Sequence, residues 1–358
     1  MKALIAMSGG VDSSMAALLT QKEGFECIGC TMKLFENRDA GLEARRTCCS
    51  LDDVEDARRV AMRMGIPYVV FNYQDAFRRC VIDKFVQSYA QGLTPNPCID
   101  CNRFLKFDLL LQRAGELGCD AVVTGHYARV ERDDRTGRYL LRKGLDASKD
   151  QSYVLYQLTQ EQLAHTRMPL GGLTKAEVRR MAEDAGFVTA HKADSEDICF
   201  VPDGNYAAVI ERELGRKAEA GDFVDPEGNV IGRHRGIIHY TIGQRKHLGQ
   251  TFGTPRYVCG IDAAANRVVL GGPEDVYASR AAAKDCTWVA GEPPAEEFRC
   301  KAKLRYRQTE AWTTVRVRGD RIDMTFDEPL RAVTPGQAAV LYDGDIVLGG
   351  GTLITEKE

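Results

Sequence analysis

The sequence lacks any apolar run long enough to span a bilayer, and neither sign of charge strongly prevails. The first absence argues against a membrane protein, and the second argues against a chain that binds nucleic acid with its whole surface. The start, from Met1 to Met7, is apolar but reaches Ser8 at once, without the longer core and cleavage site of a signal peptide. We therefore expect a cytoplasmic protein with no membrane contact.

What is present fits a globular protein of more than one domain. The 358 residues are 44% apolar and 28% charged, and the net charge is −3, so any nucleic-acid surface must be local. Twelve cysteines is a high number for such a chain. Without an export signal they should stay reduced, so some of them are expected to serve chemistry.

The pattern of apolar residues divides the chain into three parts. Strand-like and helix-like segments alternate first, as in parallel α/β folds, and glycine and short segments dominate after Pro202. Helical patterning nearly disappears after Pro273, where short strands and turns follow one another. We expect a catalytic α/β domain with a parallel sheet over residues 1–202, a small central domain over 203–275 and an all-β, barrel-like domain over 276–358.

The first part has clear candidate elements. We predict strands over residues 2–7, 27–35, 66–73 and 120–124, and helices over 11–22, 76–90 and 107–117. A further helix is expected after Ser50, because Asp53 three residues later completes a pattern like a capping box. Ligands of open α/β sheets lie beyond the carboxyl ends of the strands. The segments Ser8 to Ser14 and Gly125-His126 both lie at such ends.

The segment Ser8-Gly9-Gly10-Val11-Asp12-Ser13-Ser14 has the composition of a phosphate-binding loop. Glycines let backbone N–H groups face one concavity, the following helix N-terminus adds positive potential, and the three hydroxyls can donate to phosphate oxygens. Asp12 would repel phosphate directly, so a bridging Mg²⁺ is expected there. The Gly-Lys-Ser/Thr end of a Walker A loop is absent.

This loop resembles that of the ATP pyrophosphatase (PP-loop) superfamily. Its members cleave ATP between the α- and β-phosphates and attach AMP to a substrate oxygen. Synthetases of small molecules and tRNA-modifying enzymes share the loop, so it predicts the activation chemistry and leaves the substrate open.

Three cysteines stand in polar, motif-like segments. Cys98 and Cys101 belong to the Pro-rich segment from Thr94 to Asn102, which we expect to be non-helical, and Cys199 belongs to the segment Asp194 to Phe200. A loop thiol beside a phosphate site feels positive potential, which favours the nucleophilic thiolate.

The other cysteines are interpreted mainly as core residues, namely those at 27, 30, 80, 119, 259, 286 and 300. Cys27 and Cys30 could complete a zinc pattern with Cys98 and Cys101. Their predicted strand sends them to opposite faces, which argues against that site. No role is assigned to the pair at 48 and 49.

A basic strand is expected near the C-terminus. Basic residues at 299, 301, 303, 305 and 307 fall on alternate positions, and a turn near Gln308 leads to Arg316 and Arg318. Residues 232–249 add four basic residues and no acid. We interpret this as a hairpin with a basic outer face, which suits a polyanion such as RNA or is simply a solvated face.

Together these segments resemble the tRNA-specific 2-thiouridylase family, nearly end to end. The resemblance is carried by the Ser8 loop, Thr94 to Asn102, Thr124 to Tyr127, Ser148 to Tyr153, Ser195 to Phe200, His239 to Lys246 and Arg305 to Gln308. It implies ATP-dependent 2-thiolation of the wobble uridine of tRNA. By that resemblance Cys199 carries a persulfide, Cys101 is the second catalytic thiol, and the two can form a disulfide after sulfur delivery.

The resemblance also implies binding residues and partners. The implied ATP site consists of Ala6, Met7, Ser8, Gly9, Gly10, Val11, Asp12, Ser13, Met32 and Gly125. The target base is expected at Asn96, Pro97 and Cys98. Further tRNA contacts are expected at His126, Lys149, Asp150, Gln151, Arg305, Tyr306 and Gln337. The partners would be tRNA and a sulfur donor such as a cysteine desulfurase or a sulfur-relay protein, and we expect a monomer.

One departure from the family leaves the chemistry open. Many members have Asp where this chain has Cys98, and a thiol weakens the role of that position as a proton carrier. Cys98, Cys101 and Cys199 could instead hold a [4Fe–4S] cluster with one open iron, in place of a metal-free persulfide relay. Three rival functions also remain open: a PP-loop enzyme for a small substrate, an RNA-binding module with a regulatory nucleotide site, and a thiol redox protein.

Overall fold

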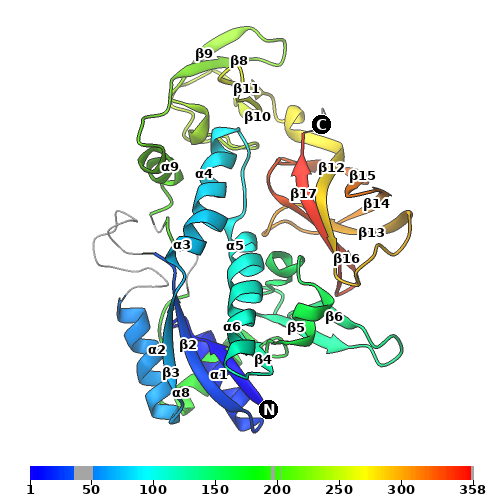
Figure 1. The fold of residues 1–358 in the computed structure, drawn as a ribbon. Helices are drawn as coiled ribbons and strands as arrows, with labels where there is room; N and C mark the ends of the chain where they lie inside the picture. Colours follow the sequence, from blue (N-terminus) through cyan, green and yellow to red (C-terminus); the bar gives the residue numbers. More distant parts are fainter. Residues whose placement is uncertain (36–50, 195–197, 202, 356–358) are drawn as a thin grey trace.

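The computed structural model describes residues 1–35, 51–194, 198–201 and 203–355. The cysteines at 48 and 49, the expected cap at Ser50 and the motif residues 195–197 lie outside this range. In the described part, no helix is long and apolar enough to cross a membrane. Figure 1 shows an N-terminal α/β unit, a small sheet at the opposite end and a β-barrel at the side.

The N-terminal sheet has five parallel strands in the order β3-β2-β1-β4-β7. The strands are β1 (Lys2–Ala6), β2 (Glu26–Lys33), β3 (Tyr68–Asn72), β4 (Ala121–Val123) and β7 (Thr166–Arg167). The helices packed beside them are α1 (Val11–Lys22), α2 (Leu51–Met64) and α8 (Lys175–Asp184). The inner strand β1 is an apolar run buried on both faces, as central strands of parallel sheets are.

Cys27 and Cys30 on β2 are both buried but belong to different core clusters. The two thiols therefore face opposite sides of the sheet, as the strand pattern predicts. A zinc site built from this pair is excluded by that geometry.

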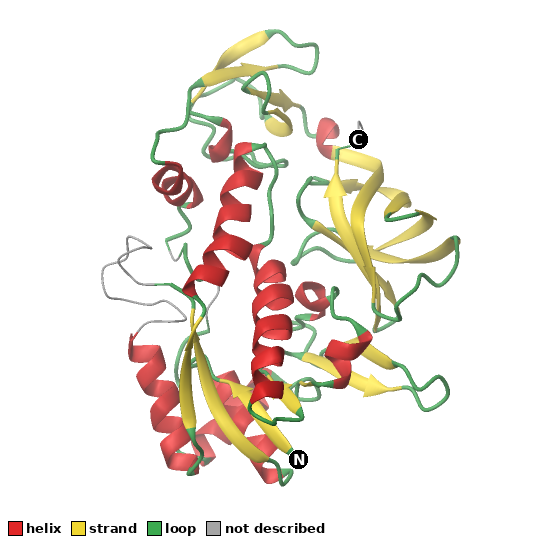
Figure 2. Ribbon diagram, in the orientation of Figure 1, coloured by secondary structure: helices red, strands yellow, loops and turns green. Residues whose placement is uncertain are grey.

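Two helical rods rise from this sheet (Figure 2). The first rod comprises α3 (Gln74–Phe77), η1 (Arg78–Ile82) and α4 (Asp83–Ala90), and the second comprises α5 (Pro97–Asp100), η2 (Cys101–Leu109) and α6 (Leu110–Glu116). The prediction that residues 94–102 are non-helical is therefore wrong from Pro97 onward. Asn96 caps the helix by accepting from the backbone N–H of Cys98, and Pro97 occupies the first helical position, where its missing N–H and fixed φ are favourable.

The central part is a four-stranded sheet in the order β10-β11-β8-β9. Its elements are α9 (Tyr206–Leu214), β8 (Gly221–Val224), β9 (Val230–His234), η4 (Ile237–His239), β10 (Tyr257–Asp262), β11 (Arg267–Gly271) and η5 (Glu274–Val276). Phe223 and Val258 of this sheet share one apolar cluster with Phe77 and Phe85 of the first rod, which joins the two parts.

The C-terminal part is an eight-stranded antiparallel sheet closed by a pairing between β12 and β17. Its own strands are β12 (Tyr277–Trp288), β13 (Glu297–Lys303), β14 (Ala311–Arg318), β15 (Arg321–Arg331), β16 (Ala338–Asp343) and β17 (Ile346–Ile354). The remaining two, β5 (Ala128–Arg132) and β6 (Tyr139–Lys143), come from the N-terminal part of the chain. Ile346 on β17 pairs with Arg142 on β6, an interaction that local sequence patterns do not reveal.

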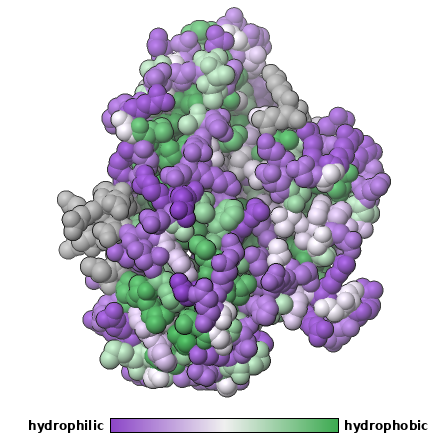
Figure 3. Space-filling view, viewed as in Figure 1, coloured by the Kyte–Doolittle hydropathy of each residue, from purple (hydrophilic) through white to green (hydrophobic). Residues whose placement is uncertain are grey.

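Two short helices, η3 (Ser152–Leu155) and α7 (Gln160–Ala164), follow this hairpin in the chain. The visible surface is polar over most of the barrel, and apolar residues gather over the N-terminal sheet (Figure 3). The edge strand β3 exposes Val69 and Val70.

Candidate active site

The predicted phosphate loop joins the end of β1 to the start of α1. Gly9 has a φ of +73°, and a Cβ there would lie 2.3 Å from the carbonyl oxygen of Asp53. Only glycine combines that backbone conformation with so close an approach. The N–H of Ser8 donates to Oγ of Ser13 at 3.1 Å, and that hydroxyl donates to the carbonyl of Gly10 at 3.1 Å, so the loop is closed on itself.

The hydroxyl of Ser14 does not face this loop's concavity. Ser14 is fully buried, donates to the carbonyl of Gly10 at 2.9 Å and accepts from the hydroxyl of Thr189 at 3.1 Å. Both hydrogen-bonding functions of the Ser14 hydroxyl are therefore used inside the protein, and its bond to phosphate stays a prediction.

Gly125 brings the end of β4 against the loop. A Cβ at Gly125 would lie 2.8 Å from the backbone carbon of Asp12 and 2.8 Å from the backbone nitrogen of Ser13. The two strand ends that we expected to carry ligand-binding segments therefore touch. The rest of the predicted ATP set lies on the elements that adjoin the loop: Ala6 and Met7 at the end of β1, Val11 at the start of α1, and Met32 on β2, which pairs with β1.

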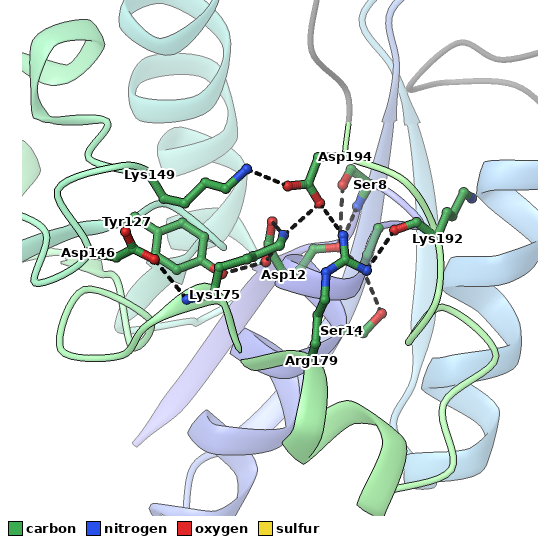
Figure 4. A network of polar contacts seen from close by, with 12 residues as sticks. Ser8, Asp12, Ser14, Tyr127, Asp146, Lys149, Lys175, Arg179, Lys192 and Asp194 are labelled. Atoms are coloured by element: carbon green, nitrogen blue, oxygen red, sulfur yellow. Dashed lines mark hydrogen bonds and ion pairs between the residues drawn. The ribbon is translucent and has the colours of Figure 1, made fainter. Parts of the chain in front are cut away.

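A network of ion pairs lies beside the loop (Figure 4). Nζ of Lys175 is 2.8 Å from both carboxylate oxygens of Asp12 and 2.8 Å from Oδ1 of Asp194. Asp194 also accepts from Lys149 at 2.7 Å and from Arg179 at 2.8 Å. The hydroxyl of Tyr127 donates to Asp12 at 2.8 Å.

The pKa shifts in the network follow from burial and neighbours. Burial and the adjacent Asp12 carboxylate raise the pKa of Tyr127 far above its ordinary value, so the phenol stays a hydrogen-bond donor. Burial alone would raise the pKa of Asp194, but hydrogen bonds from Lys149 and Lys175 outweigh it and lower that pKa. Asp194 therefore stays ionised.

A second set of hydrogen bonds and ion pairs connects the loop and α2 to Lys192, which precedes Cys199 in the chain. Nζ of Lys192 donates to the carbonyl of Gly9 at 3.0 Å, to Asp53 at 2.6 Å and to Asp56 at 2.7 Å. The three interactions hold Lys192 against the phosphate loop and α2.

The two predicted catalytic thiols pack on one apolar cluster. Cys101 and Cys199 are both half-buried against it, and Met32 of the predicted ATP set contacts the same cluster. Neither thiol forms a disulfide with another described cysteine. Cys98 is exposed on the first turn of the second rod.

His126 is a buried, neutral group beside the loop. Its Nδ1 lies 2.8 Å from the hydroxyl of Thr124, and its ring lies against Phe107. Complete burial lowers its pKa well below the ordinary value, and Lys106 lowers it further. His126 can therefore donate or accept a hydrogen bond but does not bring a positive charge to the site.

The remaining predicted tRNA residues connect the parts of the chain in this structure. Nε2 of Gln337 donates to the carbonyl of Thr94 at 2.7 Å, the hydroxyl of Tyr306 donates to the carbonyl of Asp150 at 3.2 Å, and Oε1 of Gln151 accepts from the N–H of Tyr127 at 3.0 Å. The contacts of Gln337 and Tyr306 place the barrel beside Thr94 and Asp150.

Arg305 is turned inward, contrary to its predicted place on a basic outer face. The strand β13 ends at Lys303, and the guanidinium of Arg305 donates to the carbonyl of Ile242 at 2.7 Å and to the hydroxyl of Thr334. Burial, followed by repulsion from Arg331, lowers its pKa. Arg305 therefore links the barrel to the central part.

The predicted hairpin itself is confirmed, because β13 pairs with β14 over Glu297–Ala302 and Ala311–Arg316. Its basic face is partly neutralised, since Arg299 pairs with Asp327 at 2.7 Å and Arg316 pairs with Glu297 at 2.6 Å. Trp312 is half-exposed on this hairpin, with the cations of Arg299 and Lys301 near its ring.

Comparisons with known proteins agree with this geometry. Three family models match the chain: a tRNA methyl transferase HUP domain over residues 1–203, a tRNA methyl transferase PRC-barrel domain over 207–272 and an aminomethyltransferase beta-barrel domain over 279–353. Full-length relatives are more informative than these descriptions because they cover almost all of both chains. The tRNA-specific 2-thiouridylase MnmA of Clostridioides difficile is 48% identical over 98% of this chain and 98% of its own.

The chain belongs to the tRNA-specific 2-thiouridylase family. The relatives of the same name from Acetivibrio thermocellus and Symbiobacterium thermophilum are 48% and 49% identical, each over 98% of this chain and over 99% and 92% of their own. The expected family membership and the three-part fold, with a parallel α/β sheet and a C-terminal barrel, are both confirmed.

The thiols of this 2-thiouridylase family member do not gather as a metal site. Within the ranges that the structure describes, no three Cys, His, Asp or Glu side chains lie close enough to hold a metal ion. Cys98, Cys101 and Cys199 are all described, so they do not fit an iron–sulfur cluster in this arrangement.

Asp12 suits the Mg²⁺ that the family's use of ATP implies. In nucleotide sites Mg²⁺ is held by one or two carboxylates, and phosphates and water complete its coordination. Asp12 offers one such carboxylate within the first turn of α1, beside the phosphate loop.

Sequence reasoning missed the cations of this site. Lys175 and Arg179 lie on α8, far along the chain from the loop, and no motif singles them out. One signal points to Lys175: Thr174 and Glu177 form a capping box, so Lys175 falls in the first turn of a helix, where a cation opposes the helix dipole. A lysine in that position suggests an anionic partner.

Proposed function

We propose that this chain is an ATP-dependent tRNA-uridine 2-sulfurtransferase that converts the wobble uridine of tRNA to 2-thiouridine. The observation that supports the proposal is that Met32, on the strand next to the phosphate loop, packs on the same extended apolar cluster as Cys101 and Cys199. The full-length similarity to enzymes named tRNA-specific 2-thiouridylase supports the same substrate.

The first step activates the base. The C2 oxygen of a flipped-out uridine attacks the α-phosphorus of ATP, the bond to the β-phosphate breaks, and pyrophosphate leaves. The backbone N–H groups and hydroxyls of Ser8 and Ser13 would bind the phosphates, and Asp12 would hold Mg²⁺, which neutralises phosphate charge. The neutral His126 and the residues Asn96 to Cys98 would orient the base.

The second step transfers sulfur. The terminal sulfur of a persulfide on Cys199 attacks C2, and the C2–oxygen bond breaks so that AMP leaves. The thiolate of Cys101 then attacks Sγ of Cys199, which releases the thiocarbonyl of the product and forms a Cys101–Cys199 disulfide. A thiol reductant restores the two thiols, and an external persulfide donor reloads Cys199.

The remaining assignments belong to the same proposal. The donor would be a cysteine desulfurase or a sulfur-relay protein, and the tRNA surface would include Lys149, Asp150, Gln151, Tyr306 and Gln337. The functional units would be residues 1–202, 203–275 and 276–358, in a monomer that acts in the cytoplasm. Arg305 would support the tRNA surface from behind.

The direct test follows pyrophosphate release with and without unmodified tRNA, together with sulfur incorporation into the tRNA. We expect release to depend on tRNA and each thiolated base to require one ATP. Cys199→Ala should abolish sulfur incorporation, whereas Cys80→Ala, which removes a half-buried thiol from the same cluster, should retain it. Sulfur incorporation without nucleotide consumption would refute the proposal.

A further inference from the structure

Lys175 occupies a position that folding alone does not favour. It is the first residue of α8, where the helix dipole disfavours a cation, and its side chain is only 11% exposed. Burying an ammonium group costs free energy unless anions or hydrogen-bond acceptors compensate it. Asp12 and Asp194 provide that compensation here. A residue held at such cost beside a phosphate loop is a candidate for function.

The surroundings of Asp194 resemble those of a bound phosphate group. Its two oxygens accept from Lys149 at 2.7 Å, from Arg179 at 2.8 Å and from Lys175 at 2.8 Å. Three cations around one small oxyanion is the arrangement by which proteins bind phosphate. The side chains come from different parts of the chain, so the arrangement is a product of the tertiary fold.

This cluster is continuous with the phosphate loop. Lys175 bridges Asp194 to Asp12, and Asp12 belongs to the loop itself. Lys149, Lys175 and Arg179 are three cations that face the carboxylates of Asp12 and Asp194. The carboxylate of Asp146 accepts from the backbone N–H of Lys175 at 3.0 Å, so the charges of the network balance. A polyphosphate that enters the loop would therefore compete with Asp194 for the same donors.

We propose that Lys175, assisted by Lys149 and Arg179, binds the polyphosphate of ATP, and that the carboxylate of Asp194 occupies its place until nucleotide arrives. This inference rests on the proposed function, in that ATP is the ligand of the loop. It adds Lys175 and Arg179 as nucleotide-binding cations, gives Lys149 a role at the nucleotide besides its proposed contact with tRNA, and adds a built-in competitor. The competitor keeps the cations paired in the nucleotide-free enzyme and lowers the apparent affinity for ATP, because binding must displace it.

The proposal predicts opposite effects for the two members of one ion pair. Asp194→Asn should tighten the binding of a non-hydrolysable ATP analogue and of inorganic pyrophosphate by about tenfold, because the competing charge is removed. Lys175→Met should weaken both by about tenfold or more, and Lys175→Arg should retain most of the affinity. In the double variant Lys175→Met/Asp194→Asn, the gain from Asp194→Asn should be much smaller.

Titration calorimetry with Mg²⁺ and without tRNA measures these affinities. Asp184→Asn and Arg180→Met are matched controls, since both residues are exposed on α8, and their affinities should stay within about twofold of wild type. The thermal midpoint without ligand checks that each variant is folded, and Asp194→Ser replaces Asp194→Asn if the latter does not fold.

Unchanged or weaker binding by folded Asp194 variants would overturn the inference, as would wild-type affinity in Lys175→Met. If the wild-type chain binds neither the ATP analogue nor inorganic pyrophosphate, the proposed ATP-dependent function is overturned instead. The two failures are therefore distinguishable within one experiment.

Discussion

Replacing Gly125 by alanine tests whether the contact between β4 and the phosphate loop supports catalysis. The new Cβ would lie 2.8 Å from backbone atoms of both Asp12 and Ser13, whereas ordinary contact begins near 3.4 Å. Backbone cannot rotate away as a side chain can, so the loop or the end of β4 must move by about 0.6 Å, the difference between those two distances.

Overpacking of this kind costs about 1–3 kcal/mol, and a misplacement of about 1 Å at an active site can lower the rate about 100-fold. For the smaller shift at Gly125 we expect kcat/KM for ATP to fall about tenfold, with most of the loss in KM because the loop binds the phosphates. The thermal midpoint should fall by a few degrees at most, because each kcal/mol shifts the midpoint of a chain of this size by only about 1–2 °C.

The assay is pyrophosphate release at saturating tRNA with varied ATP. Gly172→Ala is the matched control, because a Cβ at Gly172 meets nothing within 4 Å, and it should behave as wild type. A wild-type KM for ATP in folded Gly125→Ala, or an equal defect in both variants, would refute the reasoning.

Three further outcomes are expected. Cys101→Ala should retain ATP binding but accumulate a mixed disulfide between Cys199 and tRNA, visible as a reductant-sensitive adduct on a denaturing gel. Gln337→Ala removes a 2.7 Å hydrogen bond to the carbonyl of Thr94 and should lower the tRNA-dependent rate several-fold without changing ATP affinity in calorimetry. His126 is neutral in the fold and ionises in the unfolded chain below about pH 6.5, so the free energy of unfolding should fall with decreasing pH from there, by up to about 1.4 kcal/mol per pH unit. His126→Gln should make that slope shallower in denaturant titrations, and an unchanged slope would contradict the assignment.

The sequence alone predicts the structural features that depend on the spacing of residues close together in the chain. The helix at Val11–Lys22 has the predicted bounds, and the segments at Ser8 and Gly125 meet as expected from their places at strand ends. These predictions succeed because hydrophobic periodicity and the geometry of parallel sheets act over short distances. The start of α5 at Pro97 escapes prediction because proline breaks a helix in its interior but is favourable at its first position.

The long-range part of the site could not be predicted in this way. Lys175 is 163 residues from Asp12, and only the folded chain brings the ammonium group to the carboxylate. The inward turn of Arg305 has a similar origin, because its partners Ile242 and Thr334 belong to different parts of the chain. Alternation along a strand predicts which face a side chain takes, but it does not predict where the strand ends.

The pairing of Arg142 on β6 with Ile346 on β17 has a consequence for biosynthesis. A ribosome must translate some two hundred further codons before the partner of β6 exists, and still more before that partner has left the exit tunnel. Until then the hairpin of β5 and β6 carries an unsatisfied edge, which is open to wrong partners such as another nascent chain. If translation stops near the C-terminus, β17 is missing and the hairpin of β5 and β6 keeps its unpaired edge. The truncated chain would therefore aggregate through this hairpin, so the segment recognised by quality control would lie far in the sequence from the missing residues.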